Sequence, residues 1–150
     1  MVITFFGHSK IYNSTNLASE IENAILQQAT KGEKITFYCG GYGDFDNISA
    51  KVCRSIKENG VDCEIMLIIP YLPEMGRVDI RSKIERSLYD GSIYPSLERV
   101  PKRLAILKRN EWMIDNSDII IAFVKHDYGG AYKALEYANK KGKAVINIAE

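Results

Sequence analysis

The chain has 150 residues, the usual length of a single domain, and its 20 Lys and Arg nearly balance its 19 Asp and Glu. A formal charge of +1 excludes a global field that would draw nucleic acid or a membrane surface, so any anion site must be local. Three cysteines without a CxxC pair fit poorly with a disulfide framework and favour a reducing cytoplasm. The first apolar run, residues 2–6, is far too short for a signal peptide or a membrane span, so we expect a cytoplasmic protein.

Apolar runs rich in β-forming residues alternate with segments of helical period along the chain. The runs are apolar nearly throughout, as in parallel strands that are covered on both faces. We therefore predict one α/β domain over residues 1–150, a three-layer Rossmann-like fold with about five parallel strands in the order 3-2-1-4-5. The predicted strands are residues 2–6, 34–39, 64–70, 118–124 and 143–148.

Four helices are predicted between and after these strands. The first carries an apolar stripe that starts at Leu17, and the second carries Ile48, Val52 and Ile56 and closes at Asn59 and Gly60. The third and fourth are predicted over residues 104–116 and 131–141. In the long segment 71–103, spacing four predicts a short amphipathic helix, and the segment reads either as a lid or as a surface insertion. Its apolar residues are Ile80, Ile84 and Leu88, and the basic residues beside them are Arg77, Arg81 and Arg86.

Three glycine-containing loops follow predicted strands. They are "FGHSK" (6–10), "CGGYGDFD" (39–46) and "HDYGGAYKALE" (126–136). Glycine after a strand is common turn chemistry, so each loop alone is weak evidence. Since the carboxyl ends of parallel strands meet at one edge of the sheet, where helix N-termini also point, the three loops together predict a nucleotide or phosphate pocket.

The same motifs resemble a known superfamily. "TFFGHS", "GGYGDFD", "LKRNEWMIDNSDIIIAFV" and "YGGAYKALEYANKKGKAVINI" are similar to the SLOG superfamily, which unites DprA-like Rossmann domains with the lonely-guy phosphoribohydrolases. The likeness spans nearly the whole chain and is strongest to a small bacterial branch with TGHR, GG.GFD and RN..M.D.SD motifs. Ser9 stands where that branch usually has Arg. The resemblance implies a nucleotide, nucleoside monophosphate or ADP-ribose derivative as ligand, and a homodimer or larger assembly.

The resemblance also implies catalytic residues for an N-glycosidase. Arg109 takes the place of the catalytic arginine of lonely-guy enzymes, and Glu136 or Ala134 takes the place of the glutamate, depending on how the glycine pair is aligned. These two positions lie about 200° apart on a helix. The apolar stripe of Ala131, Ala134, Leu135 and Ala138 places Glu136 at the border or on the solvent side, which favours a surface charge.

Two aspartates, Asp44 and Asp46, stand where the second helix begins. We predict that Asp44 caps this helix, because its side-chain oxygen can accept an otherwise unpaired backbone N–H. Asp46 is then in the first turn, either to accept a hydrogen bond from a ribose hydroxyl or as a favourable first-turn acid. Without Glu136, these aspartates are the remaining carboxylates near the pocket.

The predicted site therefore combines all three loops with the third helix. The predicted ligand-binding residues are Gly7, His8, Ser9, Gly40, Gly41, Tyr42, Gly43, Asp46, Arg109, Asn110, Gly129, Gly130 and Ala131. His8 and His126 lack the partners that a zinc site needs, so we predict no metal and no cofactor.

Three function classes follow from this site. The leading one is a domain that senses or sequesters a nucleotide-derived molecule. The second is an N-glycosidase that uses Arg109 and Glu136. The third is DprA-like binding of single-stranded nucleic acid, which the balanced charge disfavours and a basic cluster keeps open. The cluster consists of Arg99, Lys102, Arg103, Lys108 and Arg109.

Overall fold

A computed structural model describes residues 1–29, 32–72 and 88–149 of the chain. Within these residues, six parallel strands form one sheet in the order β4-β3-β2-β1-β5-β6. The strands are β1 (Val2–Gly7), β2 (Ile35–Cys39), β3 (Cys63–Ile68), β4 (Gly91–Ile93), β5 (Ile119–Phe123) and β6 (Ala144–Asn147). The five long strands keep the predicted order. The predicted number was one short, because β4 adds a sixth strand beyond β3.

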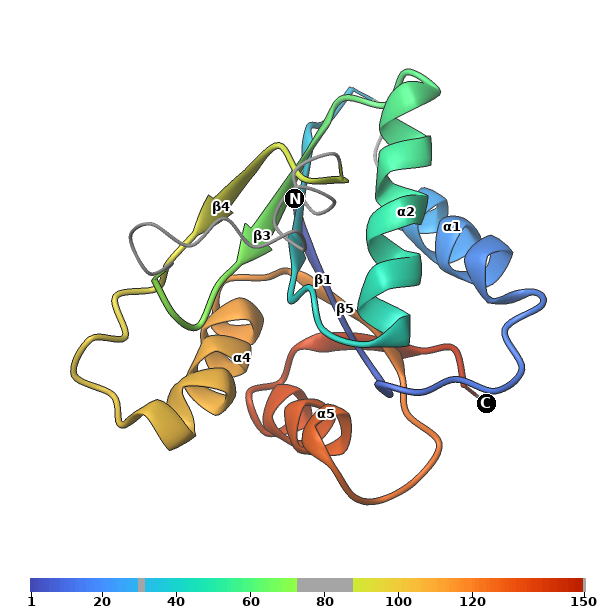
Figure 1. Ribbon diagram of the computed structural model, residues 1–150. Helices are drawn as coiled ribbons and strands as arrows, with labels where there is room; N and C mark the ends of the chain where they lie inside the picture. The colour runs from blue at the N-terminus through green and yellow to red at the C-terminus, as the bar shows by residue number, and fades with distance from the viewer. Residues whose placement is uncertain (30–31, 73–87, 150) are drawn as a thin grey trace.

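The helices cover both faces of the sheet, so the domain has the predicted three layers (Figure 1). Helices α1 (Leu17–Gln28) and α2 (Asp44–Glu58) lie on one face. On the other face lie α4 (Ala105–Asp115), preceded by the short 3-10 helix η1 (Lys102–Leu104), and α5 (Gly130–Lys140). The helix predicted around Ile80 and Ile84 lies outside the described residues.

Successive strand residues point to opposite faces of the sheet, and this alternation builds two cores. In β1, Ile3 and Phe5 pack with α1 and α2, whereas Phe6 packs with α4 and α5. Strand β5 lies between β1 and β6 and is covered by helices on both faces. Every residue of β5 is therefore buried, as the unbroken apolar run predicts. Each fully buried Ile or Phe contributes about 1.5–3 kcal/mol of hydrophobic free energy.

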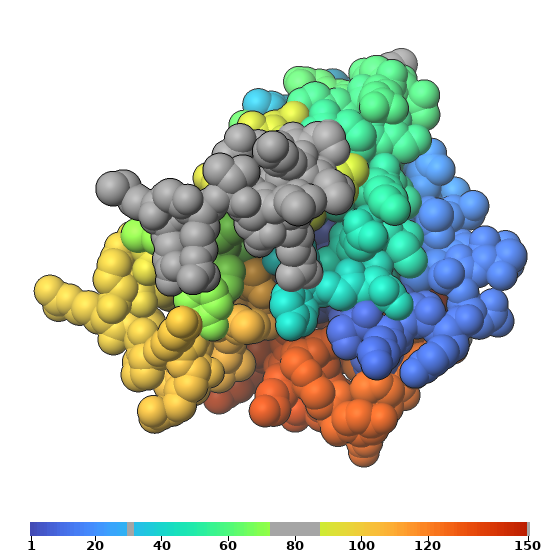
Figure 2. Space-filling view, viewed as in Figure 1, coloured from blue at the N-terminus to red at the C-terminus, as the bar shows by residue number. Residues whose placement is uncertain are grey.

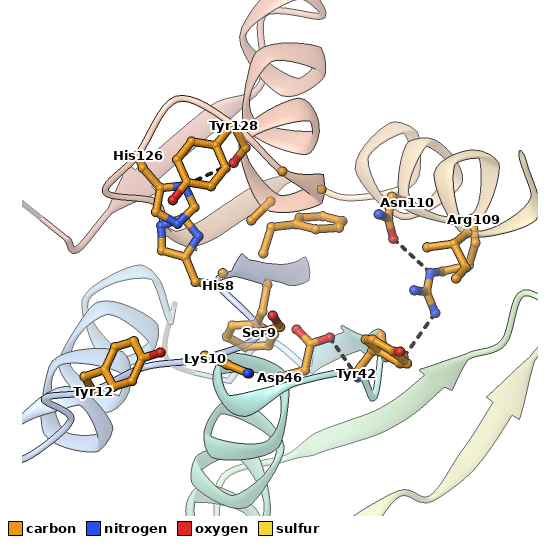
Figure 3. Close-up of a pocket in the computed structure, with 18 residues that line it drawn as sticks. His8, Ser9, Lys10, Tyr12, Tyr42, Asp46, Arg109, Asn110, His126 and Tyr128 are labelled. Carbon is orange, nitrogen blue, oxygen red and sulfur yellow. Dashed lines mark hydrogen bonds between the residues drawn. The ribbon is translucent and has the colours of Figure 1, made fainter.

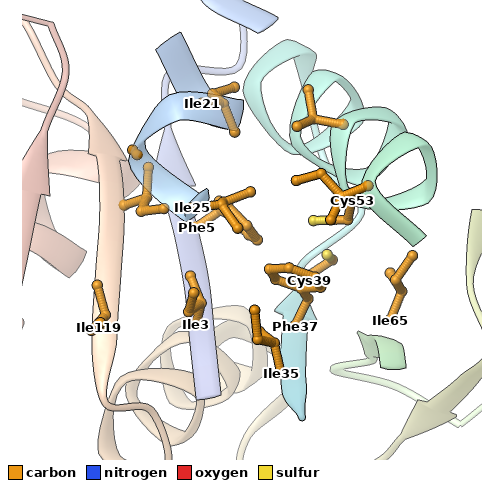
Figure 4. Packing of buried hydrophobic residues seen from close by; sticks show 14 of the residues in the cluster. Ile3, Phe5, Ile21, Ile25, Ile35, Phe37, Cys39, Cys53, Ile65 and Ile119 are labelled. Carbon is orange, nitrogen blue, oxygen red and sulfur yellow. The ribbon is translucent and has the colours of Figure 1, made fainter. Parts of the chain in front are cut away.

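The core under α1 and α2 also holds the cysteines (Figure 4). Cys39 of β2, Cys53 of α2 and Cys63 of β3 are buried free thiols. Burial raises the pKa of the Cys53 thiol well above its usual value, and the nearby Cys39 thiol adds to this rise. These cysteines are therefore small apolar packing residues of the structure.

Candidate functional site

The three glycine loops meet at the carboxyl edge of the sheet and enclose a pocket of about 570 Å³. In Figure 2 the residues after β1, drawn in blue, lie between the start of α2 and the start of α5. This is the point where the chain order reverses between β1 and β5, the usual ligand position in open parallel sheets. The pocket is lined by Phe5, Phe6, Gly7, His8, Ser9, Lys10, Tyr12, Gly40, Tyr42, Asp46, Ile106, Arg109, Asn110, His126, Tyr128, Gly129, Gly130 and Ala131.

The first two loops are packed together too tightly for side chains at their glycines. A β-carbon on Gly7 would overlap the ring of Phe45, which is fully buried. A β-carbon on Gly43 would lie 2.6 Å from the α-carbon of Ser9, and the φ of Gly43 is +93°. Gly7 and Gly43 therefore let the loops approach one another, and Gly43 does not itself line the pocket.

Asp44 does not cap α2, so this prediction was wrong. The helix begins at Asp44 itself, its N-cap is Gly43, and no side chain caps it. The carboxylate of Asp44 turns back and accepts the backbone N–H of Ile11 at 2.9 Å, while its own N–H donates to the Ser9 carbonyl at 2.8 Å. The two bonds attach the first loop to the start of the helix.

Asp46 forms the acidic end of the pocket (Figure 3). Its Oδ2 accepts the backbone N–H of Tyr42 at 3.0 Å, which is its one hydrogen bond within the described part of the chain. Burial raises the pKa of the Asp46 carboxyl to about 6, although the Tyr42 N–H and the charge of Arg109 act in the opposite direction. Oδ1 is therefore left to accept a donor from a ligand.

Arg109 lies behind the pocket, and its guanidinium joins the ends of two strands. Its side chain is buried, and Nη1 donates to the carbonyls of Gly40 at 3.0 Å and Ile68 at 2.9 Å. Nε donates to Asn110 Oδ1 at 2.9 Å. Burial lowers the pKa of Arg109, while the Asp46 carboxylate raises it. Arg109 is thus chiefly a positioning residue that holds the Gly40 turn and compensates the charge of Asp46.

The opposite end of the pocket suits an anion. Helix α5 begins at Gly130 without a side-chain cap, and Gly129, Gly130 and Ala131 line the pocket. A β-carbon on Gly129 or Gly130 would meet no atom within 4 Å, so a ligand has open access to this backbone. The unpaired N–H groups and the helix dipole favour a negative group here.

Three aromatic rings form a stack on one wall of the pocket. The rings of His8 and His126 are 3.7 Å apart between centroids, and those of His126 and Tyr128 are 3.9 Å apart. Their planes differ by 14° and 15°. His8 comes from the first loop and the other two rings from the third, so the stack joins these loops.

Most of the predicted ligand-binding residues line this pocket, with two exceptions. Gly43 packs on Ser9, and Gly41 faces Leu67, whose Cδ1 would lie 2.6 Å from an added β-carbon. Glu136 is exposed on α5 and does not line the pocket either. The sequence reasoning missed some lining residues, namely Phe5, Phe6, Lys10, Tyr12, Ile106, His126 and Tyr128. Ile106 lies in α4 and carries no sequence signal for the pocket, whereas the others precede or follow the glycines of the first and third loops by a few residues.

One member of the basic cluster proposed for nucleic acid is buried. Arg109 is only 4% exposed, and Lys108 pairs with Glu111 at 3.2 Å. Arg99, Lys102 and Arg103 are exposed. The structure therefore removes Arg109 from any strand-binding face.

The described residues contain neither a membrane-spanning helix nor a cluster of metal ligands. No described helix is long and apolar enough to cross a membrane. Among the same residues, no three His, Cys, Asp or Glu side chains are grouped so that they could hold a metal ion.

Comparison with known proteins shows a shared fold. No family model and no curated protein matches the sequence. The solved structure of TM1055 superposes with a TM-score of 0.57 at 13% identity, over 96% of this chain and 71% of that chain. Two structures of the molybdenum cofactor carrier protein from Chlamydomonas reinhardtii superpose with TM-scores of 0.57 and 0.55, at 16% and 18% identity. They cover 99% of this chain, and 76% and 75% of the carrier chains. The domain is therefore a Rossmann-like α/β fold.

Proposed function

We propose that the pocket binds a nucleotide or a nucleotide-derived molecule, such as a nucleoside monophosphate or an ADP-ribose derivative, as a sensor or sequestering domain. The observation that carries the proposal is the pairing of two unlike ends in one pocket: the uncapped start of α5 and the carboxylate of Asp46. A phosphate binds the backbone N–H groups at Gly130 and Ala131. A ribose hydroxyl donates to Asp46.

The charges decide which end of the pocket binds the phosphate and which end binds the ribose. Asp46 repels a phosphate, so the anionic group goes to the N-terminus of α5. Asp46 is half-buried, and a ribose hydroxyl supplies a donor to its Oδ1. A ligand with a phosphate at one end and a diol nearby satisfies both groups.

Membership in the SLOG superfamily is part of this proposal. The motifs behind the resemblance supply the three loops around the pocket, and the Rossmann-like fold is the one expected for the superfamily. A neighbour of the same fold is named a molybdenum cofactor carrier protein, which is in keeping with binding without turnover. The homodimer or larger assembly stays a prediction.

An N-glycosidase is the second candidate, with a different carboxylate from the one first considered. Glu136 is exposed and outside the pocket, whereas Asp46 is the one carboxylate among the pocket-lining residues of the described chain. Its pKa of about 6, raised by burial, suits a group that exchanges protons near neutral pH. Such a carboxylate activates water or stabilises an oxocarbenium-like sugar in glycoside hydrolysis.

One experiment separates the two candidates. Purified protein is denatured, the released small molecules are identified by mass spectrometry, and the native protein is incubated with AMP, ADP-ribose and any molecule recovered. Chromatography measures free base over time, and calorimetry measures affinity. Stable binding of intact nucleotide supports the sensor, whereas free base that accumulates and stops in Asp46→Asn supports the glycosidase. If the protein neither binds nor hydrolyses any nucleotide, both candidates are refuted.

Asp44→Asn is the matched control for Asp46→Asn. Both variants remove one negative charge from the first turn of α2 and keep a side-chain acceptor, but Asp44 does not line the pocket. We expect Asp46→Asn to weaken AMP binding about tenfold, since a hydrogen bond to a charged group contributes about 1.5–3 kcal/mol. Asp44→Asn should leave the affinity within twofold.

Single-strand binding, the third candidate, has its own discriminating measurement. Affinity for a strand falls steeply with salt because counterions are released at each neutralised phosphate. A nucleotide in the pocket neutralises few phosphates, so its affinity should respond far less. A steep salt dependence of oligonucleotide binding would move the protein to the third class.

A further inference from the structure

The stack of His8, His126 and Tyr128 is held by hydrogen bonds as well as by contacts between the rings. The backbone N–H of Lys125 donates to Nε2 of His8 at 2.8 Å, so this nitrogen carries no proton and His8 is neutral with its hydrogen on Nδ1. His8 also makes a T-shaped contact with the buried ring of Phe123, at 6.2 Å between centroids. The inner ring of the stack is thus fixed by its hydrogen bond and by packing.

The middle ring is fixed as well. Nδ1 of His126 lies 3.1 Å from the carbonyl oxygen of Tyr128, and because a carbonyl only accepts, Nδ1 carries the hydrogen. This bond joins the middle ring to the backbone of the residue that supplies the outer ring. The three planes consequently stay within 15° of their neighbours. Such pre-ordering lowers the entropy cost of adding a further ring.

The outer ring is open to a ligand. Tyr128 is 66% exposed although it lines the pocket, and His126 is its one ring contact within residues 1–29, 32–72 and 88–149. One face of Tyr128 is therefore covered by His126 and the other is free. Tyr128 also directly precedes Gly129 and Gly130, where α5 begins, so a stacking surface and an anion-binding backbone are adjacent in the chain (Figure 3).

We infer that Tyr128, backed by His126 and His8, is a stacking platform that selects ligands with a flat heteroaromatic ring attached to the anionic group bound at the start of α5. This inference rests on the proposed function and adds the ring to it. The spacings within the stack, 3.7 and 3.9 Å, match the separation at which aromatic planes make contact. A nucleobase on the free face of Tyr128 becomes the fourth layer of the stack.

The test compares two ligands that differ only in the ring. AMP carries adenine, and ribose 5-phosphate presents the same phosphate and sugar with a hydroxyl group in place of the base. Stacking of a base on an aromatic side chain changes affinity by about tenfold or more. The wild-type protein should therefore prefer AMP over ribose 5-phosphate by about tenfold, as measured by calorimetry and by competition against a fluorescent AMP analogue.

Variants of Tyr128 decide whether this platform is the cause. In Tyr128→Ala the preference for AMP should disappear while the affinity for ribose 5-phosphate stays within twofold, and Tyr128→Phe should keep the preference. Tyr71→Ala, which removes an exposed tyrosine outside the pocket lining, is the control for loss of a surface ring. An unchanged preference in Tyr128→Ala, or an equal loss for both ligands, overturns the inference. If the wild-type protein binds neither of these ligands and does not bind ADP-ribose either, the proposed function itself fails, and the inference with it.

Discussion

The carboxylate of Asp46 and the guanidinium of Arg109 both border the space where Gly40 lacks a side chain. A β-carbon on this glycine would lie 3.0 Å from Oδ2 of Asp46 and 3.6 Å from Cζ of Arg109. Gly40 therefore leaves room for two opposite charges beside the pocket. Burial holds Asp46 toward its neutral form, and the neighbouring cation partly offsets this effect.

The raised pKa of Asp46 predicts how stability depends on pH. The carboxyl has a pKa of about 6 in the folded protein and 3.8 as a free side chain. Between these values the folded state binds more protons, so the free energy of unfolding falls as the pH rises. The loss is at most about 3 kcal/mol, at about 1.4 kcal/mol per pKa unit. Urea unfolding of wild type and Asp46→Asn from pH 4 to 7.5 measures it, since the variant lacks this group.

Asp44→Asn controls this measurement. Asp44 is an exposed acid two residues away in the same helical turn. Its removal should leave the wild-type pH dependence in place. A difference between wild type and Asp46→Asn that stays constant from pH 4 to 7.5 would contradict a buried, protonated Asp46.

Replacing Arg109 by leucine should destabilise the protein by about 3 kcal/mol. The change leaves the carbonyls of Gly40 and Ile68 without their donor and removes the cation beside Asp46. Chemical denaturation measures the loss, and an NMR titration should find the pKa of Asp46 higher than in wild type. Lys108→Ala, on the exposed side of α4, should change stability by less than about 0.5 kcal/mol. A stable Arg109→Leu protein would show that the hydrogen bonds from Arg109 to Gly40 and Ile68 are not needed for stability.

The fold was largely predictable because its signals are local. Five strands are nearly unbroken apolar runs, and the helices carry apolar stripes at helical spacing. Strand β4 has no such run, since Gly91–Ile93 is only three residues long. Asp90 holds this edge through distant partners: it accepts the N–H of Ile65 and pairs with Lys57 at 2.8 Å. Contacts of that kind leave no periodic pattern in the sequence.

The cap at the start of α2 failed as a prediction because tertiary contacts compete for the side chain. Sequence preference places an aspartate at the N-cap. Here Gly43 occupies that position with φ +93°, because any side chain would overlap Ser9. Asp44 moves into the helix and binds Ile11 instead. The packing of the first loop therefore overrode the local preference for an aspartate cap.

The position of the site could be predicted from the sequence, but many of its individual contacts could not. Strands with parallel order bring their carboxyl ends together, so the glycine loops were expected to meet. Which glycine faces the ligand depends on the neighbouring strand: Gly41 faces Leu67 of β3, and Gly40 faces the pocket. The stack of His8 on His126 joins residues that are far apart in the sequence, and no spacing rule links them.

Filling the anion end should abolish binding without harming the fold. Gly130 is the first residue of α5, and a β-carbon there would meet no atom within 4 Å. Gly130→Leu adds a side chain to this open part of the pocket and should weaken AMP binding at least tenfold. The melting temperature should stay constant or rise, because glycine in a helix costs up to about 1 kcal/mol relative to alanine. Gly130→Ala adds only a methyl group and should show a much smaller effect in the same calorimetry. Wild-type affinity in Gly130→Leu would place the anion elsewhere.

The histidine pair predicts a second, opposite pH dependence. Burial lowers the pKa of His8 below 6.5, and the neighbouring His126 and Lys125 lower it further. Just below pH 6.5 the unfolded chain binds the extra proton first, so this group makes stability rise with pH, opposite in sign to Asp46.

A proton on Nε2 of His8 would also face the donating N–H of Lys125 and break the hydrogen bond that holds the stack. NMR titration of the ring protons should therefore find His8 titrating below 6.5 in wild type. In His126→Phe, which keeps a ring and removes a charge, the pKa of His8 should move back upward yet stay below 6.5, because burial is the larger cause. A His8 that titrates at 6.5 or above in wild type would mean that the stack does not persist in solution.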